Sequence, residues 1–279
     1  MEKIIALFLF FCLGFVQAQD IKEKSELDAL LDSLFTIDTL SIINASSSFL
    51  YASAQYDNQV YFSGRDFEID QYGFAPSLTY MNTNGLFVNL GALYYSALEP
   101  AWDLVAAGVG HFWYLNSDKS MSVQGSFNRF FYAEEQDGLN KNLLSTGLSC
   151  RKKKLGAGLG VGYLFGGDAT YYITLRTDYN IDLAEWGKVE IGVRPSIDLL
   201  FSQQNITEQV SLTEVTERDV FDLINTQLAI PLEIDVGSFD VELSYNINLP
   251  KALPDEESLS TNGFVSIGVG YILPFWEQI

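Results

Sequence analysis

The sequence predicts an all-β protein: an antiparallel transmembrane β-barrel of about twelve strands with a short N-terminal amphipathic helix. Three observations predict this fold class. Apolar residues recur at every second position through a long series of segments, and the connections between these segments alternate between short and long. After the N-terminal apolar run, no stretch is apolar for the ~20 residues that a spanning helix needs, so an inserted mature chain must use strands.

The alternation is clearest in residues 188–199, where one phase is apolar and the other is charged or small. The apolar phase holds Val189, Ile191, Val193, Pro195, Ile197 and Leu199, and the other holds Lys188, Glu190, Gly192, Arg194, Ser196 and Asp198. Successive side chains of a strand point to opposite faces of its sheet. One face would therefore contact lipid and the other would line a polar interior.

Residues 1–18 are expected to be a signal peptide, because Lys3 precedes an apolar run from Ile4 to Phe15 and Ala18 ends a small-residue cleavage site. Residues 19–45 then form a periplasmic segment. Leucines at helical spacing predict an amphipathic helix over residues 24–35, which could cap or plug the barrel, lie at the inner interface or bind a periplasmic partner. Cys150 is the single cysteine of the mature chain, so no disulfide forms within it.

Residues 46–279 are expected to form the barrel. The strands are predicted near residues 46–57, 72–82, 86–97, 102–115, 120–132, 142–151, 155–165, 170–181, 188–201, 221–236, 238–249 and 262–275. Their number is even, as in single-chain bacterial barrels. The segments also reach the ~9 to 11 residues that a tilted strand needs to cross a bilayer.

The connections predict the orientation of the barrel. Tight turns are expected at residues 83–85, 116–118, 152–154, 184–187 and 237–238, where Asn-Gly and Gly-Ser pairs tolerate positive φ. The longer, polar connections span residues 58–71, 133–140, 202–220 and 250–260, and the exceptions at 98–101 and 166–169 are short. Short periplasmic turns and longer external loops are usual in outer-membrane barrels, so both termini should face the periplasm.

Aromatic residues are expected to form two girdles at the membrane interfaces. The periplasmic girdle would contain Tyr80, Trp113, Tyr114, Trp186, Phe275 and Trp276, and the outer one Tyr94, Tyr95, Trp102, Phe130, Phe131, Tyr132, Tyr171 and Tyr172.

The net charge of -20 excludes nucleic acid as a partner, because phosphate binding needs clustered cations. The acids gather in the predicted external loops: Asp66, Glu68, Asp70, Glu134, Glu135, Asp137, Glu208, Glu214, Glu217, Asp219, Asp255, Glu256 and Glu257. They could hold divalent cations that bridge to lipopolysaccharide, draw cationic solutes toward a pore, or only keep the loops solvated.

Charged residues of the inward phase are the candidates for a lumen lining: Arg176, Asp178, Lys188, Glu190, Arg194, Asp198, Glu233, Asp235, Asp240 and Glu242. A hairpin turn at residues 183–185 would set Arg176 opposite Glu190 and Asp178 opposite Lys188. The four acids beside Gly237 would repel one another unless Arg194, Lys188 or a cation matched them. Such residues could tie the interior together or line a solute path.

The predicted barrel size is compatible with either a filled interior or a solute path. About 8 strands enclose an interior filled by side chains, 16 or more enclose an aqueous channel, and twelve lies between. Glycines share the inward phase of two strands: Gly156, Gly158, Gly160 and Gly162 on one, and Gly108 and Gly110 on the other. They could widen a lumen, or they could permit curvature or close packing.

An enzymatic reading finds little support in the residue inventory. A Ser-His mechanism needs a general base, and His111 is the only histidine. Its phase, shared with Val109 and Trp113, is the lipid-facing one. One histidine and one mature cysteine do not supply a typical zinc site. We therefore expect no catalytic residue, metal or cofactor.

Several short segments resemble uncharacterised outer-membrane β-barrel proteins of the Bacteroidota. They are Tyr61-Phe-Ser-Gly-Arg-Asp, Tyr72-Gly-Phe-Ala-Pro-Ser-Leu-Thr-Tyr, Gly85-Leu-Phe-Val and Asp28-Ala-Leu-Leu-Asp-Ser-Leu. The resemblance implies an outer-membrane location and no established activity. The expected partners of such a barrel are outer-membrane lipid, lipopolysaccharide and the barrel-assembly machinery. Barrels of this kind often finish on an aromatic residue, whereas this chain continues past Trp276 to Ile279.

The polar inward phase and the acidic loops favour a narrow, porin-like channel for small cationic solutes. The first alternative is a structural or interaction barrel without conductance that displays its acidic external loops. A lipid hydrolase of the outer membrane is the third hypothesis, and it would have to depend on His111.

Overall fold

The computed structural model describes residues 48–275 apart from residues 62, 67–69, 133–137, 212–213 and 255, and it leaves out the side chains of residues 103 and 206–217. The predicted signal peptide, the predicted helix at 24–35 and Trp276 lie outside the described residues. The strands are β1 (Phe49–Asp57), β2 (Gly73–Met81), β3 (Leu86–Tyr95), β4 (Trp102–Tyr114), β5 (Met121–Tyr132), β6 (Asn142–Lys152), β7 (Leu155–Phe165), β8 (Thr170–Tyr179), β9 (Ile181–Trp186), β10 (Val189–Val193), β11 (Ser196–Ser211), β12 (Glu214–Val236), β13 (Phe239–Pro250) and β14 (Asn262–Pro274).

These fourteen strands build a barrel wall of twelve, because two strands of the wall are each interrupted once. After Asn180 the chain of β8 continues as β9, and after Arg194 and Pro195 the chain of β10 continues as β11. Proline has no N–H to donate to a ladder, which explains the second break. The Pro195 carbonyl still accepts a hydrogen bond from the backbone N–H of Tyr179 at 3.1 Å.

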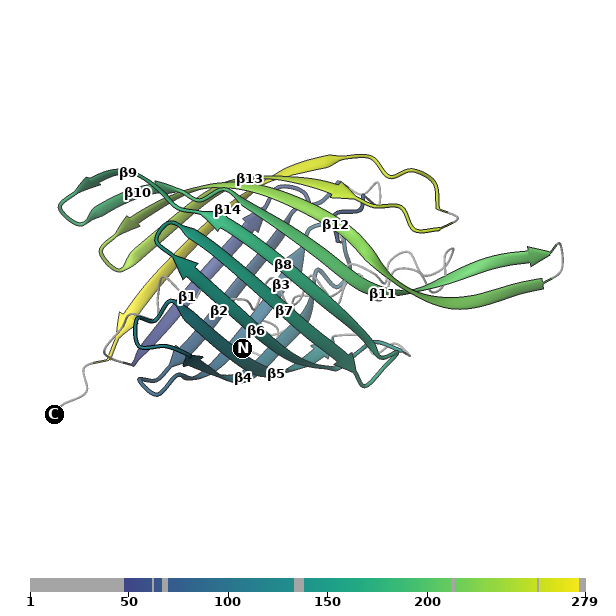
Figure 1. The fold of residues 1–279 in the computed structure, drawn as a ribbon, viewed down its shortest axis with the longest axis horizontal. Coiled ribbons are helices and arrows are strands. Elements are labelled where there is room, and N and C mark those ends of the chain that lie inside the picture. Colours follow the sequence, from purple (N-terminus) through teal and green to yellow (C-terminus); the bar gives the residue numbers. More distant parts are fainter. Residues whose placement is uncertain are drawn as a thin grey trace.

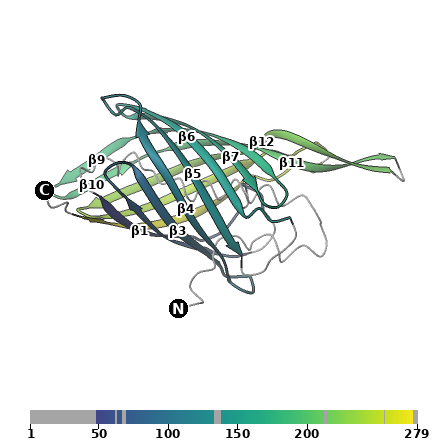
Figure 2. The same cartoon turned by 90° about the horizontal axis from the view of Figure 1, so that it is seen from below.

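The wall is a closed, entirely antiparallel ring (Figures 1 and 2). Strands that are consecutive in the wall pair with each other, and β1 pairs with β14 to close the barrel. We call the end that carries the short connections, such as residues 82–85 and 153–154, the turn end. The opposite end, which carries residues 58–72 and 251–261, is the loop end. The predicted antiparallel barrel and the order of its twelve predicted strands are confirmed.

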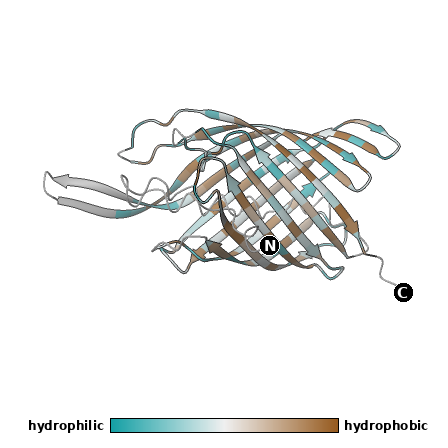
Figure 3. Ribbon diagram, turned by 180° about the vertical axis from the view of Figure 1, so that it is seen from behind, coloured by the Kyte–Doolittle hydropathy of each residue, from teal (hydrophilic) through white to brown (hydrophobic). Residues whose placement is uncertain are grey.

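The two faces of the wall differ as the alternation predicts. Leu143 and Leu144 are neighbours on β6, yet Leu143 is 0% exposed inside the barrel and Leu144 is 56% exposed outside it. Apolar and polar bands alternate along the strands (Figure 3). An apolar outer face on a closed barrel is the arrangement that a lipid environment requires. In the described part of the chain, no helix is both long and apolar enough to cross a membrane.

Two predicted connections are wrong. Residues 202–220 were expected to form a loop, but β11 and β12 extend through them as paired strands. Polar composition suggested a loop, whereas β-branched residues such as Ile206, Val215 and Thr216 favour a strand. The tight turn expected at residues 184–187 lies at Gly187 and Lys188, because β9 continues to Trp186. Gly187 has a φ of 63°, a left-handed conformation that glycine adopts without strain.

The aromatic girdles are confirmed in part. Trp113, Trp186, Phe131 and Tyr171 lie exposed on the outer face. Tyr95, Phe130 and Tyr172, which were expected in the outer girdle, instead point into the barrel and are buried there, and Tyr132 packs against the same group. The physical reason is the period of two, which sends neighbouring residues of a strand to opposite faces.

The main apolar core of the described chain lies at the loop end. It contains Ala92, Leu93, Tyr95, Leu98, Leu104, Val105, Ala106, Phe130, Leu143, Leu164 and Tyr172. Glycines make room for the bulky inward side chains, because a Cβ at Gly162 would overlap the Tyr172 ring and one at Gly110 would overlap the Phe87 ring. At these two positions the glycines permit close packing.

Candidate channel lining

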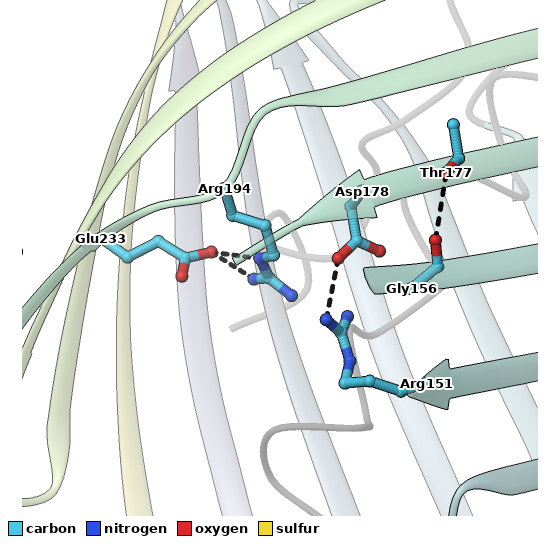
Figure 4. Close-up of polar contacts among 6 residues, drawn as sticks. All are labelled: Arg151, Gly156, Thr177, Asp178, Arg194 and Glu233. Atoms are coloured by element: carbon cyan, nitrogen blue, oxygen red, sulfur yellow. Dashed lines mark hydrogen bonds and ion pairs between the residues drawn. The ribbon is translucent and has the colours of Figure 1, made fainter. Parts of the chain in front are cut away.

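In the described part of the chain, charged pairs join inward side chains of different strands. Arg151 of β6 contacts Asp178 of β8, with Nη1 and Oδ2 2.9 Å apart (Figure 4). Nη1 of Arg176 lies 3.6 Å from Oδ1 of Asp198 on β11. The two acids lie in adjacent rows of the inner face, since Asp178 is in register with Ser196 and Asp198 is in register with Arg176.

These contacts correct the predicted pairs. Arg176 does not face Glu190, and Asp178 does not face Lys188. Because the turn lies at Gly187 and Lys188, Glu190 is paired in register with Glu185. Lys188 lies in that turn, exposed at the turn end. Asp178 instead lies over Gly156, where a Cβ would overlap its carboxylate.

Another pair joins Arg194 to Glu233 of β12 (Figure 4). The guanidinium donates from Nε to Oε1 at 2.6 Å and also from Nη2 to the same oxygen. Their side chains are 13% and 22% exposed, so the pair is mostly shielded from water. Of the three partners considered for the acids near Gly237, which were Arg194, Lys188 and a cation, Arg194 contacts one acid.

Carboxylates gather on the inner wall between this pair and the turn end. Glu190, Asp235 and Asp240 follow one another in register across β10, β12 and β13, and Glu233 is opposite Glu242. Tyr51 of β1, which sequence reasoning missed, donates its hydroxyl to Oδ1 of Asp240 at 3.0 Å. Its position in the inward phase of β1 was the available signal, but its partner is 189 residues away.

The described inward charges do not balance. Arg151, Arg176 and Arg194 each contact an acid. Glu190, Asp235, Asp240 and Glu242 have no ion pair with a described cationic side chain. In the described residues, no group of three or more His, Cys, Asp or Glu has an arrangement that could hold a metal ion. The excess of carboxylates makes this inner wall electronegative.

Amide side chains continue the polar lining toward the loop end. Asn225 donates to Oδ1 of Asn248 at 3.1 Å, Asn248 donates to Oδ1 of Asn262 at 2.9 Å, and Asn262 donates to the carbonyl of Gly64 at 2.6 Å. This chain of hydrogen bonds crosses β12, β13 and β14 and ends on the β1–β2 connection. It therefore ties a loop to the inner wall.

The β1–β2 and β13–β14 connections are also held together by a buried ion pair. Nη1 of Arg65 lies 2.8 Å from Oε1 of Glu256, and the two side chains are 9% and 11% exposed. A Cβ at Gly64, next to Arg65, would overlap the Asn225 side chain of β12. We call Arg65 and Glu256 the loop latch. The latch and the apolar core both lie at the loop end.

His111 lies on the outer face, as its strand phase predicts. Its ring stacks on Trp113 with the centroids 4.2 Å apart. It is in register with Leu86 and Gly125, and neither residue offers a nucleophile.

The chain was compared with protein families, curated proteins and solved structures. No protein-family model matches the sequence. No curated protein matches it either. Among solved structures, the KdgM porin and the NanC porin are 11% and 12% identical, each covering 80% of this chain and 98% of its own, with TM-scores of 0.46. An outer membrane channel from Pseudomonas putida F1 is 10% identical over 82% of this chain and 96% of its own, with a TM-score of 0.50. This last likeness supports the fold of a closed antiparallel outer-membrane-type barrel.

Proposed function

We propose that the chain is an outer-membrane channel of low conductance that prefers small cations and carries out no catalysis. The observation that carries the proposal is the charge imbalance of the inner wall, where four carboxylates near the turn end lack a described cationic partner. Rings or walls of carboxylates select cations because they replace part of the ion's hydration and raise its local concentration. In this proposal the turn end faces the periplasm and the loop end the exterior.

The size of the solute follows from the loop end. The apolar core and the loop latch occupy part of the barrel there, so a bulky solute would have to displace packed side chains. Inorganic cations and small amines need less room. The outer-membrane solved structure with a TM-score of 0.50 is itself named as a channel, which is consistent with this function.

The test is conductance of the refolded full chain in a planar bilayer with a salt gradient. Stepwise openings with a cation-selective reversal potential are expected. The triple variant Asp235→Asn, Asp240→Asn and Glu242→Gln should shift that potential toward zero. A matched control, Glu208→Gln, Glu217→Gln and Asp219→Asn, removes the same number of charges outside the barrel and should leave it unchanged. Equal shifts in both triples would contradict a selective inner wall.

One observation favours a second candidate, a barrel without conductance that displays its loops. Leu104, Leu143, Leu164 and Tyr172 are all 0% exposed inside the loop end. If they seal the lumen, a folded barrel stays electrically silent in the same experiment. Contact with lipopolysaccharide through divalent cations on the acidic loops, and recognition by the barrel-assembly machinery, belong to either candidate as predictions.

A further inference from the structure

The strands β11 and β12 continue beyond the rest of the wall as a two-stranded ribbon (Figures 1 and 2). Pairing of β11 with β8 ends at Ser202, and pairing of β12 with β13 ends at Asn225. The β11–β12 pairing itself runs on to Ser211 and Glu214. We call residues 205–211 and 214–219 the distal ribbon. At ~3.3 Å per residue it extends by about 20 Å.

Both edges of the distal ribbon lack a strand partner within the described part of the chain. An edge strand presents a row of backbone N–H and C=O groups that can pair with another extended chain. An isolated two-stranded ribbon is also only marginally stable in water. A third strand would satisfy one row of backbone groups and stabilise the ribbon, which is the physical basis of recognition by strand addition.

The charge of the distal ribbon restricts the chemistry of such a strand. The ribbon contains Glu208, Glu214, Glu217 and Asp219 against a single cation, Arg218. Charges on an edge oppose self-pairing, so two copies of this ribbon would repel each other. Three of the four acids belong to β12 and only Glu208 belongs to β11. A basic strand would therefore be attracted most strongly to the β12 edge.

We infer that the β12 edge of the distal ribbon is a docking site for an extended basic segment of another protein, which adds to it as a third strand. Backbone hydrogen bonds would supply the affinity, and the acids Glu214, Glu217 and Asp219 would supply the preference for lysine or arginine. The site lies outside the barrel, so it does not depend on whether the lumen conducts.

The test uses the folded full chain in detergent micelles and two labelled peptides of about ten residues, long enough to match the ribbon edge. One peptide alternates Lys and Thr, and the other alternates Lys and Pro. The charges are equal, but proline cannot donate to a ladder. The Lys-Thr peptide is expected to bind at least ~10-fold more tightly by fluorescence anisotropy, and to protect residues 214–219 from hydrogen exchange more than residues 205–211.

Two variants complete the test. Replacing residues 206–218 by Asn-Gly, which joins the paired residues Asn205 and Asp219 through a two-residue turn, should abolish binding of the Lys-Thr peptide. The triple variant Glu214→Gln, Glu217→Gln and Asp219→Asn should weaken it and should reduce its dependence on salt. Equal affinity for both peptides would mean plain charge attraction, and retained binding without the ribbon would place the peptide elsewhere. Either result overturns the inference.

Discussion

At the scale of single residues, small and charged side chains on the inner face decide what the wall can enclose. Gly162 shows this, because a Cβ there would overlap the ring of the fully buried Tyr172, while a Cβ at Gly158 on the same strand would lie 3.9 Å from its nearest neighbour. We predict that Gly162→Ala lowers the unfolding free energy by about 1–3 kcal/mol through overpacking. Urea titration in micelles measures this, and Gly158→Ala is the control that should change little. A similar loss in both variants would contradict the packing argument.

The Arg194 and Glu233 pair gives a second prediction at this scale. Arg194→Met leaves Glu233 opposite Glu242 without its guanidinium. Breaking a mostly shielded pair by removing one partner should destabilise the barrel by about 2–4 kcal/mol. The double variant Arg194→Met and Glu233→Leu should recover much of this loss, because the unpaired charge is gone. A double-mutant cycle compares the unfolding free energies of Arg194→Met, Glu233→Leu and the double variant. Purely additive losses of unfolding free energy would argue against a coupled pair.

At the scale of elements, the distal ribbon of β11 and β12 has no third strand on either edge in the described chain. Its removal should therefore cost the barrel little. We predict that replacing residues 206–218 by Asn-Gly leaves the unfolding midpoint of the barrel unchanged and still gives a compact, heat-modifiable band in gel electrophoresis. A large drop in the midpoint would mean that the ribbon supports the wall. Removal of the turn residues 187–188 should be far more damaging, because β9 and β10 are held by that turn.

At the scale of the whole molecule, the loop latch joins the first and the last connection of the loop end beside the β1–β14 closure, since Arg65 and Glu256 are 191 residues apart in the chain. If the barrel conducts, releasing the latch should open the loop end. We predict that Glu256→Gln increases mean single-channel conductance without changing its ion selectivity, which is set near the turn end. The control is Lys251→Met, which breaks an ion pair with Asp222 in a more exposed part of the same end. Equal effects in both variants would point to general loosening of the loops.

The sequence by itself determined the strands and their faces, because the period of two is local to each segment. The twelve-strand order and the inward phase of Glu233, Asp235, Asp240 and Glu242 could all be predicted from it. The sequence did not determine which inward residues contact one another. Arg176 and Lys188 did not take the partners proposed for them, because a turn displaced to Gly187 and Lys188 changes every pairing in the hairpin. Arg194 does contact one of the acids near Gly237.

Only the tertiary structure decided which side chains meet inside the barrel and how the ring of strands closes. The pairing of Tyr51 with Asp240, the loop latch and the apolar core at the loop end all join segments far apart in the chain. The alternation of apolar and polar residues predicts which face of the wall a side chain takes. It does not predict which side chain of another strand it contacts. That choice depends on the register between strands and on the closure of β1 against β14, both of which are properties of the assembled ring.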